Sequence, residues 1–152
     1  MTLAVGDLAP DFTLPDVDYN DVTLSSFRGQ GSVTLVFIPF AFSGICEAEL
    51  CELRDHQDLF ANADATVIAI SCDRSQTNKA WTEQHEFGFT MLSDGWPHGR
   101  VAELYGCFNE VAGCAERMTV VVDTDGKISS IFRSAGIGDP RQFSEYQAAL
   151  GG

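Results

Sequence analysis

The sequence is poor in basic side chains. Nine Lys and Arg residues stand against 22 Asp and Glu residues, which gives a formal net charge of −13. Nucleic acids and anionic membrane surfaces bind proteins mainly through Lys and Arg, so this composition argues against both as partners. The acidic balance favours solubility and small neutral substrates, without identifying one.

Long apolar runs are also lacking. No stretch approaches the roughly 20 residues needed to span a bilayer. The first residues, MTLAVGDLAPDF, have neither the basic start nor the apolar stretch of a secretory signal peptide. We therefore expect a cytoplasmic protein.

The five cysteines follow no metal-binding or redox pattern. They include no C-x2-C pair, and the three His are scattered, so we expect no metal site and no cofactor. A disulfide framework is rare in a reducing compartment, and an odd count excludes complete internal pairing. Some thiols should therefore be free, either reactive or simply buried.

The length and pattern predict one α/β domain over residues 1–152. A chain of this size with 45% hydrophobic residues can bury a substantial core. β-Branched and apolar runs predict core strands, and amphipathic stretches predict helices. The strands are expected at 33–40, 65–71 and 118–123, and the helices at 44–61, 75–87, 101–105 and 140–150. Asp125-Gly126 predicts a hairpin turn, so we expect a central mixed sheet flanked by helices.

The segment PFAFSGICEAEL, residues 39–50, carries the chemical signal. A buried strand ends at Pro39, a short loop follows, and Cys46 falls in the first turn of a helix. The free N–H groups and the dipole of a helix N-terminus stabilise a thiolate over a thiol. Ser43 could reach the same pocket with its hydroxyl. On position alone, Ser43 could equally be only an N-cap and Cys46 only a small buried hydrophobe.

The spacing Pro39–Ser43–Cys46 matches the P-x-x-x-[T/S]-x-x-C signature of the peroxiredoxins, and Arg117 in AERMTVVVD matches their second element. The resemblance extends over nearly the whole chain, through APDFTL, FRG, LSDGWPHG and YG. Residues 37–53 and LSDGWPHG look most like the AhpE-type peroxiredoxins of actinobacteria. The resemblance implies a thioredoxin-like fold and a thiol-dependent peroxidase.

Site roles follow from this resemblance. Cys46 would attack the outer peroxide oxygen and become a sulfenic acid. Arg117 would stabilise the thiolate and the charge that develops on the leaving oxygen. Ser43 would hold the peroxide, Pro39 would keep water out, and Glu49, on the same helix face as Cys46, would orient Arg117.

Two aromatic residues and two kinds of partner complete the prediction. Phe42 and Trp96 could line the substrate mouth, although plain packing is an equally open reading. The implied partners are a hydroperoxide and a thiol reductant, either thioredoxin or mycoredoxin with mycothiol. A homodimer is expected by resemblance alone. The other functions considered are a redox sensor or holdase and a thiol–disulfide oxidoreductase on the same fold; the missing C-x-x-C argues against the latter.

Cys51 is a possible resolving thiol, because it lies five residues after Cys46, as in the bacterioferritin-comigratory type of peroxiredoxin. On an ideal helix that spacing gives about 7.5 Å of rise and roughly 140° of rotation. The Cα atoms would lie about 8–9 Å apart, beyond the limit of about 7 Å for a disulfide, so the first turns would have to unwind. An external thiol is the alternative, and Cys72, Cys107 and Cys114 are further thiols that could approach Cys46.

Overall fold

The structure, a computed structural model, describes residues 2–151. Five strands form a central sheet in the order β5-β4-β3-β8-β9. Their bounds are β3 (Ser32–Phe37), β4 (Ala65–Ser71), β5 (Thr90–Ser93), β8 (Met118–Val122) and β9 (Ile128–Arg133). β3 pairs parallel with β4, and β4 with β5, whereas β8 is antiparallel to both β3 and β9. The sheet is therefore mixed, and the predicted fold class is confirmed.

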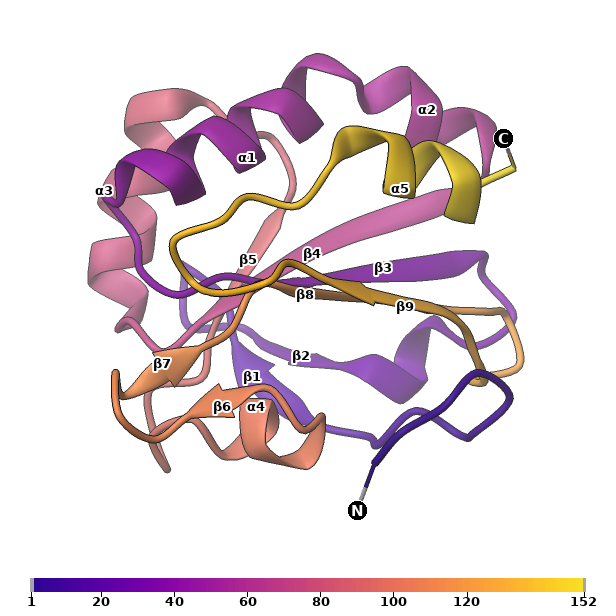
Figure 1. Cartoon of the computed structure of the whole chain (residues 1–152), viewed down its shortest axis with the longest axis horizontal. Coiled ribbons are helices and arrows are strands. Elements are labelled where there is room, and N and C mark those ends of the chain that lie inside the picture. Colours follow the sequence, from indigo (N-terminus) through magenta and orange to yellow (C-terminus); the bar gives the residue numbers. More distant parts are fainter. Residues whose placement is uncertain (1, 152) are drawn as a thin grey trace.

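Helices and smaller elements cover the two faces of this sheet (Figure 1). One face carries α1 (Gly44–Asp55), α2 (Gln57–Asn62), α3 (Ser75–His85) and α5 (Phe143–Ala149). The other face carries β1 (Thr13–Pro15), β2 (Asp21–Thr23), the 3-10 turn Leu24–Phe27 and α4 (Arg100–Leu104). A separate two-stranded hairpin, β6 (Phe108–Asn109) and β7 (Cys114–Ala115), lies beside α4.

β3 divides the core because its side chains alternate between the two faces. Leu35 and Phe37 belong to the cluster under α4, whereas Val36 and the following Ile38 belong to the cluster under α1. All four side chains are fully buried. This confirms that the apolar run from residue 33 forms a central strand covered on both faces. The strand ends at Phe37, two residues before Pro39 and earlier than the predicted range 33–40.

The predicted helix at 44–61 is interrupted at His56, which was not foreseen. The His56 ring nitrogen Nδ1 lies 2.8 Å from the Glu52 carbonyl, and the His56 N–H donates to Leu53 O at 3.2 Å. In a continuous α-helix the Glu52 carbonyl would accept the His56 N–H, but here the His56 ring nitrogen lies beside that carbonyl. The His56 N–H bonds to Leu53 O instead, which is the spacing of a 3-10 turn. α2 then starts in a new direction.

Two further elements escaped the sequence analysis. Residues 90–93 form edge strand β5, which is not among the strands predicted from the sequence. The β6–β7 hairpin has two residues in each strand, too few for period-two alternation to be visible. The predicted turn at Asp125-Gly126 is present, with Gly126 at φ 85° and its N–H bonded to Asp123 O at 3.0 Å.

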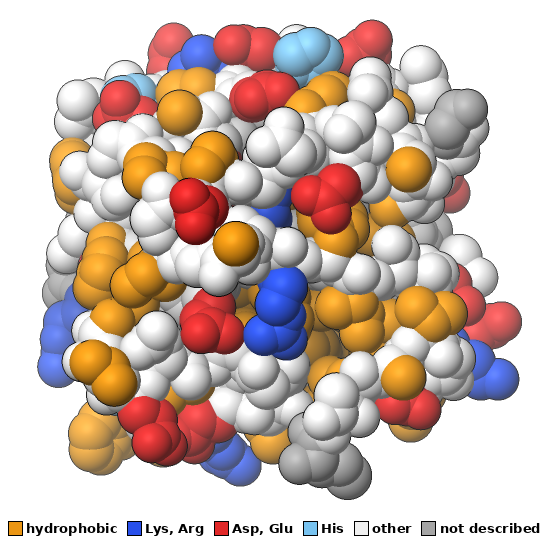
Figure 2. All heavy atoms as spheres, viewed as in Figure 1, with side chains coloured by type: hydrophobic (Ala, Val, Ile, Leu, Met, Phe, Trp, Pro, Cys, Tyr) orange, Lys and Arg blue, Asp and Glu red, His pale blue; other side chains and the backbone are white. Residues whose placement is uncertain are grey.

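The acidic excess is spread over the surface. Figure 2 shows Asp and Glu side chains distributed across the face in view rather than gathered in one patch. Within residues 2–151, every helix is too short or too polar to cross a membrane.

Candidate active site

The loop from β3 to α1 brings Cys46 to the carboxyl edge of the sheet. Pro39 is buried directly after β3, and Cys46, in the first turn of α1, is fully buried. The Ala41 N–H donates to the Asp73 carboxylate at 2.7 Å, which ties this loop to the end of β4. Phe42 takes a left-handed backbone conformation, with φ 64°, that is uncommon for a residue other than glycine. The loop is therefore held in a defined and locally strained shape.

Ser43 occupies the N-cap position of α1. Its carbonyl accepts the Glu47 N–H at 2.8 Å, but its hydroxyl makes no capping hydrogen bond with the helix. The reading of Ser43 as a side-chain cap is thus not what the geometry shows. The hydroxyl, three residues before Cys46, is not committed to the helix end.

Arg117 reaches Cys46 from the segment that leads into β8. It lies directly before β8, and its side chain is 2% exposed. Nη1 donates to Cys46 Sγ at 3.2 Å and to Glu49 Oε1 at 2.7 Å. Nε donates to the Ile137 carbonyl at 2.7 Å, which fixes the plane of the guanidinium group. One nitrogen of Arg117 therefore joins the thiol to the carboxylate.

Glu49 in turn binds a second guanidinium group, that of Arg141. Arg141 Nη2 donates to Oε1 at 2.9 Å, and Nε and the backbone N–H donate to Oε2 at 3.1 and 2.8 Å. Burial opposes ionisation of Glu49, but the hydrogen bonds and charge of Arg141, assisted by the charge of Arg117, outweigh it. The pKa of the Glu49 carboxyl therefore lies below its ordinary value.

The Arg117–Glu49–Arg141 cluster holds more positive than negative charge. Arg117 and Arg141 carry two buried positive charges, and Glu49 carries one negative charge. Uncompensated charge in a protein interior is costly. Arg117, in contact with Cys46, places positive charge beside the sulfur atom. A buried cysteine held in this way suits nucleophilic chemistry.

Comparison with known proteins agrees with this geometry. The family model described as the AhpC/TSA family matches residues 5–131. The chain belongs to this family. It is 47% identical over 150 residues to alkyl hydroperoxide reductase E of Mycobacterium tuberculosis (strain ATCC 25618 / H37Rv), covering 97% of this chain and 98% of that protein. It is 35% identical over 136 residues to peroxiredoxin Bcp of Escherichia coli (strain K12), covering 86% and 85% of the two chains.

A solved structure gives the same picture. The crystal structure of peroxidoxin BcpB from Mycobacterium tuberculosis aligns with a TM-score of 0.83 and 31% identity, covering 96% of this chain and 93% of that one. The chain is thus an enzyme of the peroxiredoxin type, with the thioredoxin-like arrangement expected from its sequence.

Two predicted residues of this peroxiredoxin lie apart from the cluster. Trp96 is 84% exposed and lines a cavity of about 290 Å³ together with Phe12 and Arg100. Cys51 is half-buried on α1, which is continuous from Gly44 to Asp55. The helix therefore keeps the separation from Cys46 that the sequence geometry implied. Burial raises the pKa of the Cys51 thiol, with Arg54 opposing the effect.

Arg141 is the site residue that sequence reasoning missed. Besides Glu49, it donates to the Phe37 carbonyl at 2.8 Å and to the Thr119 hydroxyl at 3.2 Å, so it links α1 to two core strands. Its sequence signal is weak. A cation just before a C-terminal helix is unfavourable next to the positive end of the helix dipole, and that mismatch could have pointed to an acidic partner elsewhere.

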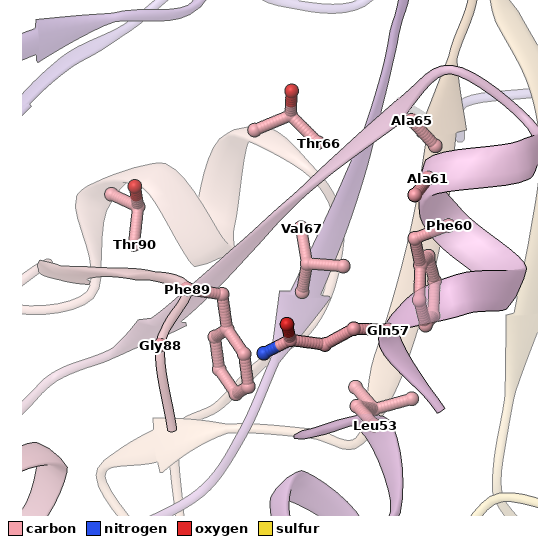
Figure 3. Close-up of a pocket in the computed structure, with 10 residues that line it drawn as sticks. All are labelled: Leu53, Gln57, Phe60, Ala61, Ala65, Thr66, Val67, Gly88, Phe89 and Thr90. Atoms are coloured by element: carbon pink, nitrogen blue, oxygen red, sulfur yellow. The ribbon is translucent and has the colours of Figure 1, made fainter. Parts of the chain in front are cut away.

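The peroxiredoxin also has a large cavity away from Cys46 (Figure 3). It measures about 450 Å³ and lies between α2, the start of β4 and the residues leading into β5. Figure 3 shows Gln57 extending its amide toward Phe89, with Val67 and Phe60 beside them. None of the predicted site residues lines it. The candidate active site is therefore the cluster around Cys46 and not this cavity.

Proposed function

We propose that this peroxiredoxin reduces hydrogen peroxide and organic hydroperoxides at the expense of a thiol, with Cys46 as the nucleophile. The observation that carries the proposal is the pair of bonds from Arg117 Nη1, at 3.2 Å to Cys46 Sγ and at 2.7 Å to Glu49 Oε1. A guanidinium group in this position stabilises a thiolate before the reaction and an oxyanion during it.

In the proposed step, the Cys46 thiolate attacks one oxygen of the peroxide and the O–O bond breaks. The sulfur gains that oxygen and becomes a sulfenic acid, while the other oxygen leaves as alkoxide or hydroxide and takes up a proton to give alcohol or water. Sulfur is oxidised by two electrons and the peroxide is reduced by two. The Ser43 hydroxyl is proposed to hold the peroxide, and buried Pro39 to limit the access of water.

Access to Cys46 is proposed to pass through the loop that precedes α1. Cys46 is fully buried, whereas Phe42 in this loop is 51% exposed. Phe42 is therefore the proposed aromatic wall of the substrate mouth. Trp96 is proposed to contribute from the 94–99 loop, whose Gly95 lies near the carbonyl of Cys72 at the end of β4.

The partners and setting are proposed on the same basis. The reductant is a thiol, either thioredoxin or mycoredoxin with mycothiol. The sulfenic acid is resolved either by Cys51, after the first turns of α1 unwind, or by the external thiol. A homodimer is proposed from the family resemblance. A reducing compartment such as the cytoplasm would keep the five cysteines in the free form that the structure shows.

The test is a stopped-flow reaction of the reduced protein with sub-stoichiometric hydrogen peroxide. Rapid loss of peroxide is expected from the unchanged chain and from the control Cys107→Ser, whose thiol is buried on the other face of the sheet. Cys46→Ser should show no rapid phase. A rapid phase retained in Cys46→Ser, or a wild-type rate no faster than that of a free thiol, would contradict the proposal.

A further inference from the structure

Three cysteines converge on one edge of the sheet because of its topology. β3 and β4 are parallel neighbours, so the chain segments that follow them emerge at the same edge. Cys46 follows β3 and Cys72 directly follows β4. β8 runs antiparallel to β3, so the residues before it, Cys114 in β7 and then Arg117, arrive at this edge as well.

Contacts at this edge connect the three thiols. Asp73, next to Cys72, accepts the Ala41 N–H of the loop that leads to Cys46, at 2.7 Å. Arg117, three residues after Cys114, donates to Cys46 Sγ at 3.2 Å. The segments that carry Cys72 and Cys114 are thus each bonded, within three residues, to the loop or the thiol of Cys46.

The electrostatic environment of Cys114 agrees with this placement. Burial raises the pKa of the Cys114 thiol, negative charge at Cys46 raises it further, and Arg117 opposes both. This influence agrees with the position of Cys114 three residues before Arg117, which contacts Cys46. Cys114 is fully buried, and along the chain only Glu116 lies between its strand and Arg117.

Cys72 is in turn adjacent to Cys114. Burial raises the pKa of Cys72 to about 12, while the backbone N–H of Ala115 acts in the opposite direction as a hydrogen-bond donor to this thiol. The Cys72 sulfur therefore lies beside the peptide bond that joins Cys114 to Ala115. Unlike Cys114, Cys72 is partly exposed.

The segment that carries Cys114 belongs to a small hairpin outside the main sheet, although Cys114 and Ala115 themselves are buried. β6 and β7 have two residues each and form a sheet of their own, and Val111 at the turn is fully exposed. Small hairpins of this kind open at low free-energy cost compared with core strands. A Cys46–Cys114 bond would leave α1 intact, whereas a Cys46–Cys51 bond requires its first turns to unwind.

We propose that Cys114 and Cys72 form an internal relay that carries the oxidation from buried Cys46 to the protein surface. The relay rests on the proposed function, because its first substrate is the Cys46 sulfenic acid. The Cys114 thiol attacks the Cys46 sulfur, the S–O bond breaks, and the hydroxyl leaves with the Cys114 proton as water, which gives a Cys46–Cys114 disulfide. The Cys72 thiol then attacks the Cys114 sulfur, which gives a Cys72–Cys114 disulfide and returns Cys46 as a thiol.

Both steps conserve the two oxidising equivalents taken from the peroxide. Cys46 is a favourable leaving group in the exchange because Arg117 stabilises its thiolate. The Cys72 thiol is mostly protonated at neutral pH because burial raises its pKa to about 12, so the relay is slower than the attack on peroxide. An external thiol would then reduce the partly exposed Cys72–Cys114 bond rather than the enclosed Cys46.

The sequence allows the predicted bonds to be mapped directly. The reduced full-length protein is treated with one equivalent of hydrogen peroxide without reductant, alkylated under denaturing conditions and digested without reduction. Trypsin places Cys46 and Cys51 together in residues 29–54, Cys72 in 55–74, and Cys107 with Cys114 in 101–117. A second cleavage after Glu110 separates Cys107 from Cys114.

The expected product is peptide 55–74 linked through Cys114, with Cys46 alkylated. Cys72→Ser should stop at a Cys46–Cys114 bond. Cys114→Ser and Cys114→Ala, two variants in case one folds poorly, should stop at a Cys46 that has gained one oxygen. The matched control Cys107→Ser, which removes a buried thiol from the opposite face of the sheet, should give the wild-type map.

Two results would overturn the relay while leaving the peroxidase intact. One is a Cys46–Cys51 bond as the wild-type product, and the other is loss of two hydrogens in the Cys114 variants. A stable sulfenic acid in the wild-type chain would likewise exclude the relay in favour of an external thiol. Failure of the wild-type chain to consume peroxide rapidly would instead refute the proposed function, so the two failures are distinguishable.

Discussion

Replacement of Arg141 by Ala is expected to be strongly destabilising, because Arg141, just before α5, binds Glu49 on α1. The substitution removes side-chain hydrogen bonds to both Glu49 oxygens, to the Phe37 carbonyl and to Thr119. Glu49 Oε2 would keep only the backbone N–H of residue 141. Glu49 would keep its ion pair with Arg117 but lose both hydrogen bonds from the Arg141 side chain.

The magnitude follows from the burial of the pair, whose side chains are 1% and 7% exposed. Removal of one partner from a buried ion pair costs about 3–5 kcal/mol. For a chain of this size, 1 kcal/mol corresponds to about 2–4 °C in Tm, so we expect a fall of about 6–20 °C. Because Glu49 also binds Arg117, the rate of peroxide consumption should fall even at temperatures well below the new Tm.

Thermal unfolding of Arg141→Ala and Arg133→Ala gives a matched comparison. Arg133 forms an ion pair with Glu116 at 3.3 Å, but the two side chains are 47% and 38% exposed. Exposed pairs contribute only about 0–1 kcal/mol, so this control should melt within about 4 °C of the unchanged chain. If Arg141→Ala were no less stable than Arg133→Ala, the structural role given to the buried ion pair would be refuted.

Three further results are expected. Because the folded-state pKa of Glu49 is lowered, its stabilisation is present above the ordinary value of 4.5 and is lost as pH falls below it; the urea midpoint should drop between about pH 6 and about pH 3, and less so in Glu49→Gln. Arg117→Lys should slow the stopped-flow reaction with peroxide by about 10²–10³-fold, because an ammonium group cannot keep all three of its contacts, and an unchanged rate constant would exclude this role. Gly99→Ala should lower the free energy of unfolding in urea by about 2–5 kcal/mol, since φ is +72° and the added Cβ meets the Phe108 ring. Gly106→Ala, at φ +74° with open space around the Cβ, should show only the cost of the backbone conformation. Equal costs for the two variants would contradict the steric argument.

The sequence predicts this fold well where each signal is local. The apolar run 65–71 coincides with β4, and the run from residue 118 with β8, because central strands are buried on both faces and leave no polar alternation. The position of Cys46 in the first turn of α1 could be predicted for a similar reason, since the strand, the proline and the helix start adjoin one another along the chain.

Features that depend on distant contacts could not be predicted in the same way. Arg141 meets Glu49 across 92 positions of sequence, and only the fold brings them together. The interruption at His56 depends on a ring nitrogen that competes for one carbonyl, which hydrophobic periodicity does not report. The proximity of Cys72 and Cys114 arises from parallel pairing of β3 with β4 and antiparallel pairing with β8, so spacing along the chain does not reveal it.

The charges of this protein are distributed differently on its surface and around Cys46. The chain has only nine basic residues for 22 acidic ones, yet two of the nine, Arg117 and Arg141, are almost fully buried around Glu49. Surface acidity repels anions but leaves the approach of a neutral hydroperoxide unhindered. Inside, one carboxylate for two guanidinium groups leaves a single positive charge in contact with Cys46. In the proposed mechanism this positive charge stabilises first the negative charge of the attacking sulfur and then that of the leaving oxygen.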